Sequence, residues 1–213
     1  MAFVWICLMR ASSFFLWLRS VPLALLLAWV VMPTSDALAQ REQMSLPDQP
    51  GYIPNPADEA PPPEFQRQVV FYRTSEAPGT IIVHTSERFL YVVQPNGRAL
   101  RYGIGVGRDG FQWQGLLQIT RKQEWPDWTP PAEMIQRQPY LPRFMAGGPG
   151  NPMGARALYL GTTVYRIHGT NQPQTIGSAV SSGCFRLVNN DVIDLYNRIP
   201  VGTKVIVRQK PEL

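Results

Sequence analysis

The sequence predicts a mainly β, single-domain fold, and three observations support this prediction. Short runs of β-branched and aromatic residues, divided by turn residues, recur from about Phe65 onward. The Asn96-Gly97 pair between two of these runs is the strongest hairpin signal in the chain. Only one segment, near the C-terminus, has the periodicity of an amphipathic helix.

The expected strands are short and follow one another in chain order. They span residues 69–73, 80–84, 88–94, 98–106, 115–122, 157–160, 163–168 and 204–208. In the strand after the hairpin, alternate positions from Leu100 to Val106 are apolar, so one of its faces is expected to be buried.

A single helix is expected near the C-terminus. Asn189 or Asn190 can cap its N-terminus, and Asp191 favours the positive end of the helix dipole. Pro200 then ends the helix. Its apolar stripe consists of Val192, Leu195, Tyr196 and Ile199.

Residues 1–39 are predicted to be a secretory signal peptide. Two arginines precede an uncharged apolar run at 21–32, and the small-residue cleavage motif Ala37-Leu38-Ala39 follows. The run has 12 residues, fewer than the ~20 that a helix needs to span a bilayer, so cleavage is favoured over an uncleaved anchor. A Pro-rich linker at 40–63 and one folded domain at 64–213 are expected to follow.

Charge and cysteine content narrow the function classes. After cleavage the chain has 18 Lys and Arg against 14 Asp and Glu, a net charge of +4, but the charges form no run and no nucleic-acid motif is present. Cys7 lies in the predicted signal peptide, which leaves Cys184 alone. That thiol is therefore a buried small hydrophobe, an intermolecular disulfide partner or a reactive group.

Residues 122–154 are predicted to form a long loop pinned by prolines. Loops of this length in a compact domain are usually lids or binding loops, and the aromatic content argues against disorder. Trp125, Trp128 and Tyr140 either cap a substrate channel or pack the sheet edge, and we expect the cap. Trp113 has no assignment from the sequence.

The segment from His168 to Arg186 carries the candidate chemistry. His168 ends a predicted strand on its more polar face, and Cys184 follows 16 residues later. A neighbouring imidazole can take the thiol proton and lower the pKa of the cysteine, as a nucleophile needs. Backbone N–H groups of Gly183 and Cys184 can stabilise an oxyanion. A zinc site needs three or four ligands, and the few soft side chains present make one improbable.

This segment resembles the signature of L,D-transpeptidase catalytic domains of the YkuD type. The matching residues are His168-Gly169-Thr170, Ile176-Gly177, Ser182-Gly183-Cys184-Phe185-Arg186, Asn190-Asp191 and 202–205, with further counterparts at 90–92 and 102–107. The resemblance covers about residues 78–208. Ser182 stands where many members have His, and His84 stands where members often have Asp; we interpret His84 as structural.

The resemblance implies a β-sandwich-like, mixed-sheet domain with one or two short helices and no cofactor or metal. It implies a periplasmic enzyme in which Cys184 attacks a peptidoglycan stem tetrapeptide and forms a thioester. His168, oriented by the carbonyl of Gly169, would be the base, and Arg186 would recognise a carboxylate or brace the loop. Ser182 and the loop aromatics would contact substrate, and carbapenems would acylate the cysteine.

Three functions remain open at this point. In the first, an amine of another stem or of an envelope protein accepts the acyl group. In the second, water accepts it, which makes the protein a peptidoglycan carboxypeptidase or endopeptidase. In the third, the domain binds the cell wall without catalysis, and Cys184 is dispensable. The membrane is expected to contact the protein only through the export signal.

Overall fold

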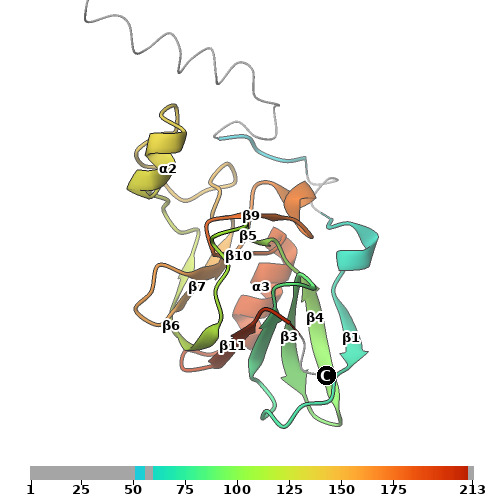
Figure 1. Cartoon of the computed structure of the whole chain (residues 1–213). Coiled ribbons are helices and arrows are strands. Elements are labelled where there is room, and N and C mark those ends of the chain that lie inside the picture. The colour runs from blue at the N-terminus through green and yellow to red at the C-terminus, as the bar shows by residue number, and fades with distance from the viewer. Residues whose placement is uncertain (1–50, 56–59, 211–213) are drawn as a thin grey trace, which may run out of the picture.

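The computed structural model describes residues 51–55 and 60–210 (Figure 1). The predicted signal peptide and most of the predicted linker lie outside the described residues. Among the described residues no helix is long and apolar enough to cross a membrane. The strands are β1 (Gln68–Phe71), β2 (Ile81–His84), β3 (Phe89–Gln94), β4 (Arg98–Gly103), β5 (Val106–Gly107), β6 (Gly115–Glu124), β7 (Arg156–Leu160), β8 (Arg166–His168), β9 (Ala179–Ser181), β10 (Phe185–Arg186) and β11 (Lys204–Arg208). The helices are α2 (Ala132–Arg137), α3 (Asn189–Arg198) and the 3-10 turns η4 (Pro63–Phe65) and η5 (Pro173–Thr175).

Nine strands form one mixed sheet in the order β1-β4-β3-β2-β11-β6-β7-β8-β10. The β11–β2 and β8–β10 pairs are parallel, and the other neighbours are antiparallel. The long strand β6 pairs with β11 in its first half and with β7 in its second, and its register shifts between Ile119 and Arg121. The predicted mainly β, mixed-sheet fold is confirmed.

The β3–β4 hairpin forms where Asn96-Gly97 predicts it. Gln94 pairs with Arg98, so the loop has three residues, and two of them, Asn96 (φ 63°) and Gly97 (φ 62°), have the left-handed backbone that these residue types favour in hairpin loops. The apolar face of β4 is buried as expected, and the same alternation of buried residues continues beyond the strand at Ile104 and Val106. The hairpin projects from the lower end of the molecule in Figure 1.

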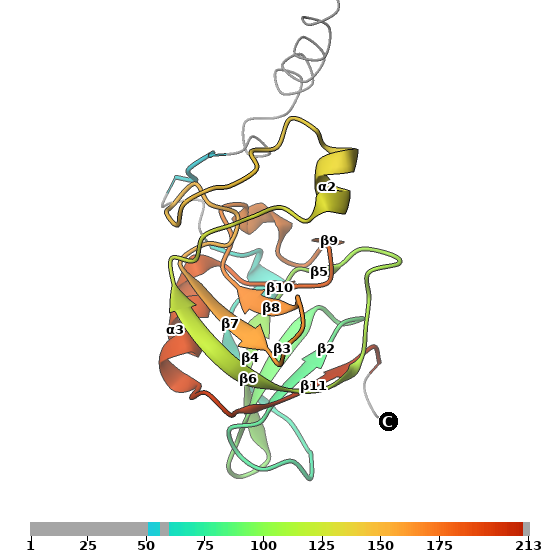
Figure 2. The ribbon, with the colours of Figure 1, turned by 90° about the vertical axis from the view of Figure 1, so that its left-hand side faces the viewer.

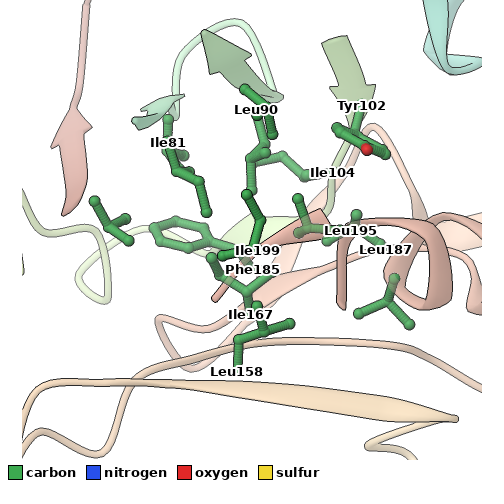
Figure 3. Close-up of a cluster of buried hydrophobic side chains, with 14 of the residues drawn as sticks. Ile81, Leu90, Tyr102, Ile104, Leu158, Ile167, Phe185, Leu187, Leu195 and Ile199 are labelled. Atoms are coloured by element: carbon green, nitrogen blue, oxygen red, sulfur yellow. The ribbon is translucent and has the colours of Figure 1, made fainter. Parts of the chain in front are cut away.

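The main hydrophobic core lies between the two halves of the sheet and α3. Phe185 of β10 lies between Ile81 and Leu90 on one side and Ile167 and Leu158 on the other (Figure 3). All five side chains are almost fully buried. Burial of one such side chain stabilises the fold by about 2 kcal/mol, so β8 and β10 are anchored by their core-facing residues.

The helix α3 has the predicted apolar stripe, but the predicted N-cap is wrong. Val188 is the N-cap, and no side chain caps the helix there. Asn189 is already helical, and its Oδ1 accepts a 2.9 Å hydrogen bond from the N–H of Ala155. The oxygen of an Asn side chain can accept a hydrogen bond from any nearby donor. Here the donor is the backbone N–H of Ala155, the residue before β7.

The strands near the site are the ones that differ most from the sequence prediction. The strand expected at 163–168 is paired only from Arg166 to His168, and β9 and β10 were not predicted. Gly105, just after β4, pairs with Arg186 of β10 through two backbone hydrogen bonds of 2.8 and 2.9 Å. This bridge joins the last strand in the sheet order to the end of β4.

Candidate active site

The parallel pairing of β8 with β10 places the two candidate catalytic residues on adjacent strands. Arg186 lies opposite His168 and Phe185 lies opposite Ile167. Because side chains alternate along a strand, the core-facing pair Ile167 and Phe185 leaves His168 and Arg186 on the outer face. Cys184 immediately precedes β10, so its side chain leaves the strand toward this outer face as well.

His168 is buried and held in one orientation by its own neighbour. Its Nδ1–H donates a 2.6 Å hydrogen bond to the carbonyl oxygen of Gly169, which is the contact expected for Gly169. Burial, followed by the charge of Arg186, lowers the pKa of His168 to about 3, although backbone hydrogen bonds to Gly169 and Met153 act in the opposite direction. The imidazole is therefore neutral at pH 7, with the Nε2 lone pair as its base.

Cys184 is a free, partly exposed cysteine whose thiol lies against the strand that carries the histidine. Its Sγ is 3.9 Å from the carbonyl oxygen of Val164. Burial raises the pKa of the Cys184 thiol, and Arg166 and Arg186 offset this only in part. The sequence argument expects a lowered thiol pKa; in the structure the resting pair is instead a neutral thiol and a neutral imidazole.

The turn before Cys184 is closed by hydrogen bonds of Ser181. Its hydroxyl donates to the carbonyl of Cys184 at 2.6 Å and accepts from the N–H of Gly183 at 3.2 Å. The Gly183 N–H is thus already used in the resting turn, which leaves the Cys184 N–H as the first candidate oxyanion donor. Among the described residues the buried Oγ of Ser182 has no hydrogen-bond partner.

Trp113 packs beside this turn, a role that the sequence did not indicate. Its ring stacks on Tyr165 with centroids 4.4 Å apart and an interplanar angle of 12°, and it lies 5.4 Å from the Phe185 ring. Gly183 has φ +102°, and a Cβ there would come within 2.6 Å of Tyr165 Cε1. Tyr165 can therefore keep its stacked position only if residue 183 has no side chain. The predicted face shared by Tyr165 and Ile167 was the only sequence signal for this contact.

Arg186 braces the loop between the two candidate catalytic residues. Its guanidinium donates to Thr175 Oγ1 at 2.6 Å and to Gln172 Oε1 at 3.4 Å. Burial lowers the pKa of Arg186 to about 10, so it remains charged at neutral pH. These contacts support the bracing role among the two roles expected for this residue.

The loop between β6 and β7 carries the predicted aromatic cap. Trp128 pairs with Met145 through two 2.8 Å backbone hydrogen bonds, and Trp125 N–H donates to Ala155 O at 2.8 Å. Figures 1 and 2 both show this loop, with α2, projecting from the end of the molecule where β5, β9 and β10 lie. Trp125 is 40% exposed, and Trp128 and Tyr140 are half-buried. The substrate role of these aromatics stays a prediction.

The end of α2 contacts a residue beside the Cys184 turn. The Arg137 guanidinium lies 5.7 Å from the Phe111 ring centroid, and Arg108 lies 4.5 Å from the same centroid. The carbonyl of Phe111 in turn lies 3.1 Å from the position of a Cβ on Gly183. His84, the other histidine, lies elsewhere and is 2.7 Å from the hydroxyl of Tyr72, which supports its structural interpretation.

A cavity of about 540 Å³ lies apart from this site, beside β3, β4, β11 and the end of α3. Arg198 and Lys204 line it, and both are paired with carboxylates, Asp194 and Glu76 respectively. Its charged groups are therefore satisfied internally. The cavity lining includes no nucleophile or base, so the outer face of β8 and β10 is the better candidate for chemistry.

Comparisons with known proteins agree with the motif. Residues 78–207 match the family model of the YkuD L,D-transpeptidase catalytic domain. The probable L,D-transpeptidase ErfK/SrfK of Escherichia coli K12 is 40% identical over 140 residues, which cover 62% of this chain and 44% of that protein. The chain thus matches less than half the length of that curated relative.

One solved structure supports the same fold. The Ldtfm–avibactam carbamoyl enzyme is similar with a TM-score of 0.50 at 17% identity, over 62% of this chain and 49% of that chain. A structure described as a probable carnitine operon oxidoreductase from Brucella melitensis is 49% identical over 69% of this chain and 96% of that chain, with a TM-score of 0.46. The family model spans more than half of the chain, and the motif residues His168, Phe185 and Arg186 lie on the paired strands β8 and β10: the chain belongs to the L,D-transpeptidase catalytic-domain family.

Proposed function

We propose that the protein is a cysteine L,D-transpeptidase that acts on peptidoglycan stem tetrapeptides and transfers the acyl group to an amine. The observation that carries the proposal is the pairing of β8 with β10, which places Cys184 beside the strand that ends in His168. The 2.6 Å hydrogen bond from His168 Nδ1–H to Gly169 O supports it, because it leaves Nε2 as the base.

In the proposed first step, the Cys184 sulfur attacks the carbonyl carbon between the L-centre and the D-amino acid. Because the thiol and the imidazole are both neutral at rest, the thiol proton moves to His168 Nε2 as the sulfur–carbon bond forms. The carbon–nitrogen bond then breaks, and the leaving D-amino acid takes the proton from His168. The product is a thioester on Cys184.

In the second step, an amine attacks the thioester and His168 takes its proton. The sulfur leaves as thiolate and recovers a proton from the imidazolium, so the enzyme returns to its neutral state. The Cys184 N–H is proposed to stabilise the oxyanion of both tetrahedral intermediates. The unpartnered Oγ of Ser182 supports a role in holding substrate at this turn.

The proposed setting is the periplasm, reached through the N-terminal signal. The acceptor is proposed to be the side-chain amine of a neighbouring stem, or an amine on an envelope protein. No nucleic acid takes part. The loop with Trp125, Trp128 and Tyr140 is proposed to cover bound stem peptide, because it projects from the end of the domain that carries β9 and β10.

Intact-mass analysis with a carbapenem tests the nucleophile. One adduct is expected on the wild-type protein and none on Cys184→Ala, with His168→Ala forming the adduct much more slowly. Matched circular dichroism spectra of the variants control for folding. A folded, reduced wild-type protein that forms no adduct would contradict catalysis and favour the wall-binding alternative.

Product analysis with purified tetrapeptide then tests the acceptor. Incubation with an added amine acceptor should release D-alanine and give a cross-linked product of the mass expected for amide formation. A tripeptide formed by hydrolysis at the same rate, whether or not the amine is present, would instead identify water as the acceptor.

A further inference from the structure

The outer face of the strands β6, β7, β8 and β10 has a charge pattern that the proposed reaction leaves unexplained. Strand register places three successive outward positions in one row, namely Arg121 on β6, Tyr159 on β7 and Arg166 on β8. Figure 2 looks toward this part of the sheet. Extension of the β8–β10 register by one residue places Cys184 next in the same row. The row thus ends at the candidate nucleophile.

Both arginines lie against the ring of Tyr159. The guanidinium carbon of Arg121 is 3.6 Å from the ring centroid and that of Arg166 is 5.2 Å from it. Gln123 anchors the Arg121 side of the cluster, since its Oε1 accepts from Arg121 at 2.7 Å and from the Tyr159 hydroxyl at 3.1 Å. The ring therefore holds two like charges near one another.

Among the described residues no carboxylate pairs with either arginine. The outward positions of the four strands contain no Asp or Glu, and within the described part of the chain neither Arg121 nor Arg166 forms an ion pair. Arg156, which points to the other face of β7, is by contrast paired with Glu124 at 3.2 Å. Two unpaired cations held together are unfavourable unless an anion joins them.

Arg166 is also the arginine near Cys184 whose hydrogen-bonding capacity is unused. Arg186 donates from Nη1 to Gln172 and from Nη2 to Thr175, although its own buried Nε has no partner among the described residues. The described residues provide no hydrogen-bond acceptor to the Arg166 guanidinium, and its buried Nε lacks a partner. A guanidinium presents several donors in a planar fork that matches a carboxylate. The charge of Arg166 also acts on both Cys184 and His168.

We propose that Arg166, supported by Arg121 and Tyr159, forms an anion-binding subsite beside Cys184 that holds a carboxylate of the acyl-donor peptide. The inference deepens the proposed function by assigning the residue that selects a carboxylate-bearing substrate. The carboxylate accepts from the Arg166 fork, and the Tyr159 ring sets the plane of that fork. Substrate binding then supplies the negative charge that the row lacks.

A pair of alkylating reagents tests the subsite without relying on transpeptidation. Iodoacetate and iodoacetamide transfer the same carbon to a thiolate with loss of iodide, but only iodoacetate is an anion. The ratio of their second-order rate constants at Cys184 therefore reports local positive charge and cancels changes in thiol pKa. We expect Arg166→Gln to lower the iodoacetate-to-iodoacetamide ratio by about three- to tenfold, with Arg166→Lys retaining most of it.

Arg98→Gln is the matched control, because it removes one positive charge from the β3–β4 hairpin. It should leave the ratio unchanged. An equal ratio in the wild type and in Arg166→Gln would overturn the subsite, as would a folded Cys184 that neither reagent labels, since an anion could not then reach the thiol.

The substrate itself gives the second test. Relative to the wild type, Arg166→Gln should raise KM for a tetrapeptide with free carboxylates about tenfold, and should have little effect on KM for the amidated peptide. Equal effects on the two peptides would contradict carboxylate recognition. If the reagent ratio responds as expected and no peptide is turned over, the anion subsite stands and the proposed transpeptidation fails.

Discussion

The indole Nε1–H of Trp113 donates a 2.8 Å hydrogen bond to the carbonyl oxygen of Gly183, the residue before the candidate nucleophile. The two residues are 70 positions apart in sequence. With the peptide plane on one side of Gly183 fixed by this bond, and the Ser181 hydroxyl bonded to the carbonyl of Cys184, the turn that carries the thiol has little freedom. Trp113 is thus a positioning residue for Cys184.

Replacement of this donor should slow the reaction without unfolding the domain. Trp113→Phe keeps an aromatic ring on Tyr165 but leaves the Gly183 carbonyl without its donor, a loss of about 1 kcal/mol. We expect carbapenem acylation of Cys184 to slow about tenfold, measured by intact mass over time. Tyr165→Phe, which keeps the stacked ring, is the control and should react at nearly the wild-type rate. Equal rates for all three proteins would show that the bond has no positioning role.

Gly183 is expected to tolerate no side chain. Gly183→Ala adds a Cβ within 2.6 Å of Tyr165 Cε1 at a φ of +102°, so we expect a loss of about 2–4 kcal/mol in the free energy of unfolding and loss of acylation. Gly202→Ala is the matched control, since Gly202 has φ +91° and open space around it. Its cost should be about 1 kcal/mol, from backbone strain alone. Urea denaturation of the two variants measures the difference.

The neutral resting pair predicts an unusual acid limb in the pH dependence of acylation. Burial holds the pKa of His168 at about 3, so the imidazole stays an unprotonated base as the pH falls through its ordinary value. The acylation rate should therefore stay nearly constant from about pH 7 to about pH 5, where an unperturbed histidine would already be protonated. A rate that halves between about pH 6 and 7 would instead indicate a histidine with an ordinary pKa.

Asp191 should make the domain less stable as the pH rises. Burial raises the pKa of Asp191 to about 6, although Arg67, 3.6 Å away, acts in the opposite direction. Because the folded pKa exceeds the unfolded one, the associated stability is present below about pH 4 and is lost as the pH rises through about 6. Asp191→Asn should therefore gain about 1–2 kcal/mol relative to the wild type at about pH 8 and little at about pH 4. A variant destabilised equally at both pH values would contradict this.

Most of the fold could be predicted because its long strands carry their own signals. The turn at Asn96-Gly97, the alternating positions of β4 and the apolar stripe of α3 each depend on residues close together in sequence. The two-residue strand β10 has no such signal, since its pairing depends on β8 and on Gly105. Asn189 was assigned to the wrong partner for the same reason, because Ala155 is 34 residues away.

In the candidate site, too, the residues within one sequence segment could be predicted and those brought together by the fold could not. Cys184, His168 and Gly169 could be predicted because a family motif links them within one segment. The contact of Trp113 with Gly183 and the outward row that contains Arg166 could not be, because both depend on which distant segments become neighbours. The thiol pKa was expected to fall because a histidine lies nearby. Burial, which a sequence does not report, instead raises the pKa of Cys184 and lowers the pKa of His168, so that both groups are neutral.

The bridge between Gly105 and Arg186 has a consequence for the way the protein behaves at high concentration. An unprotected outermost strand offers free backbone groups to other molecules and invites aggregation or domain swapping. In β10 the N–H and carbonyl of Arg186 are both occupied by Gly105, while the other edge of β10 pairs with β8. The strand next to the candidate nucleophile is thereby closed to strand addition, so a second chain cannot extend the sheet at that point and cover the thiol.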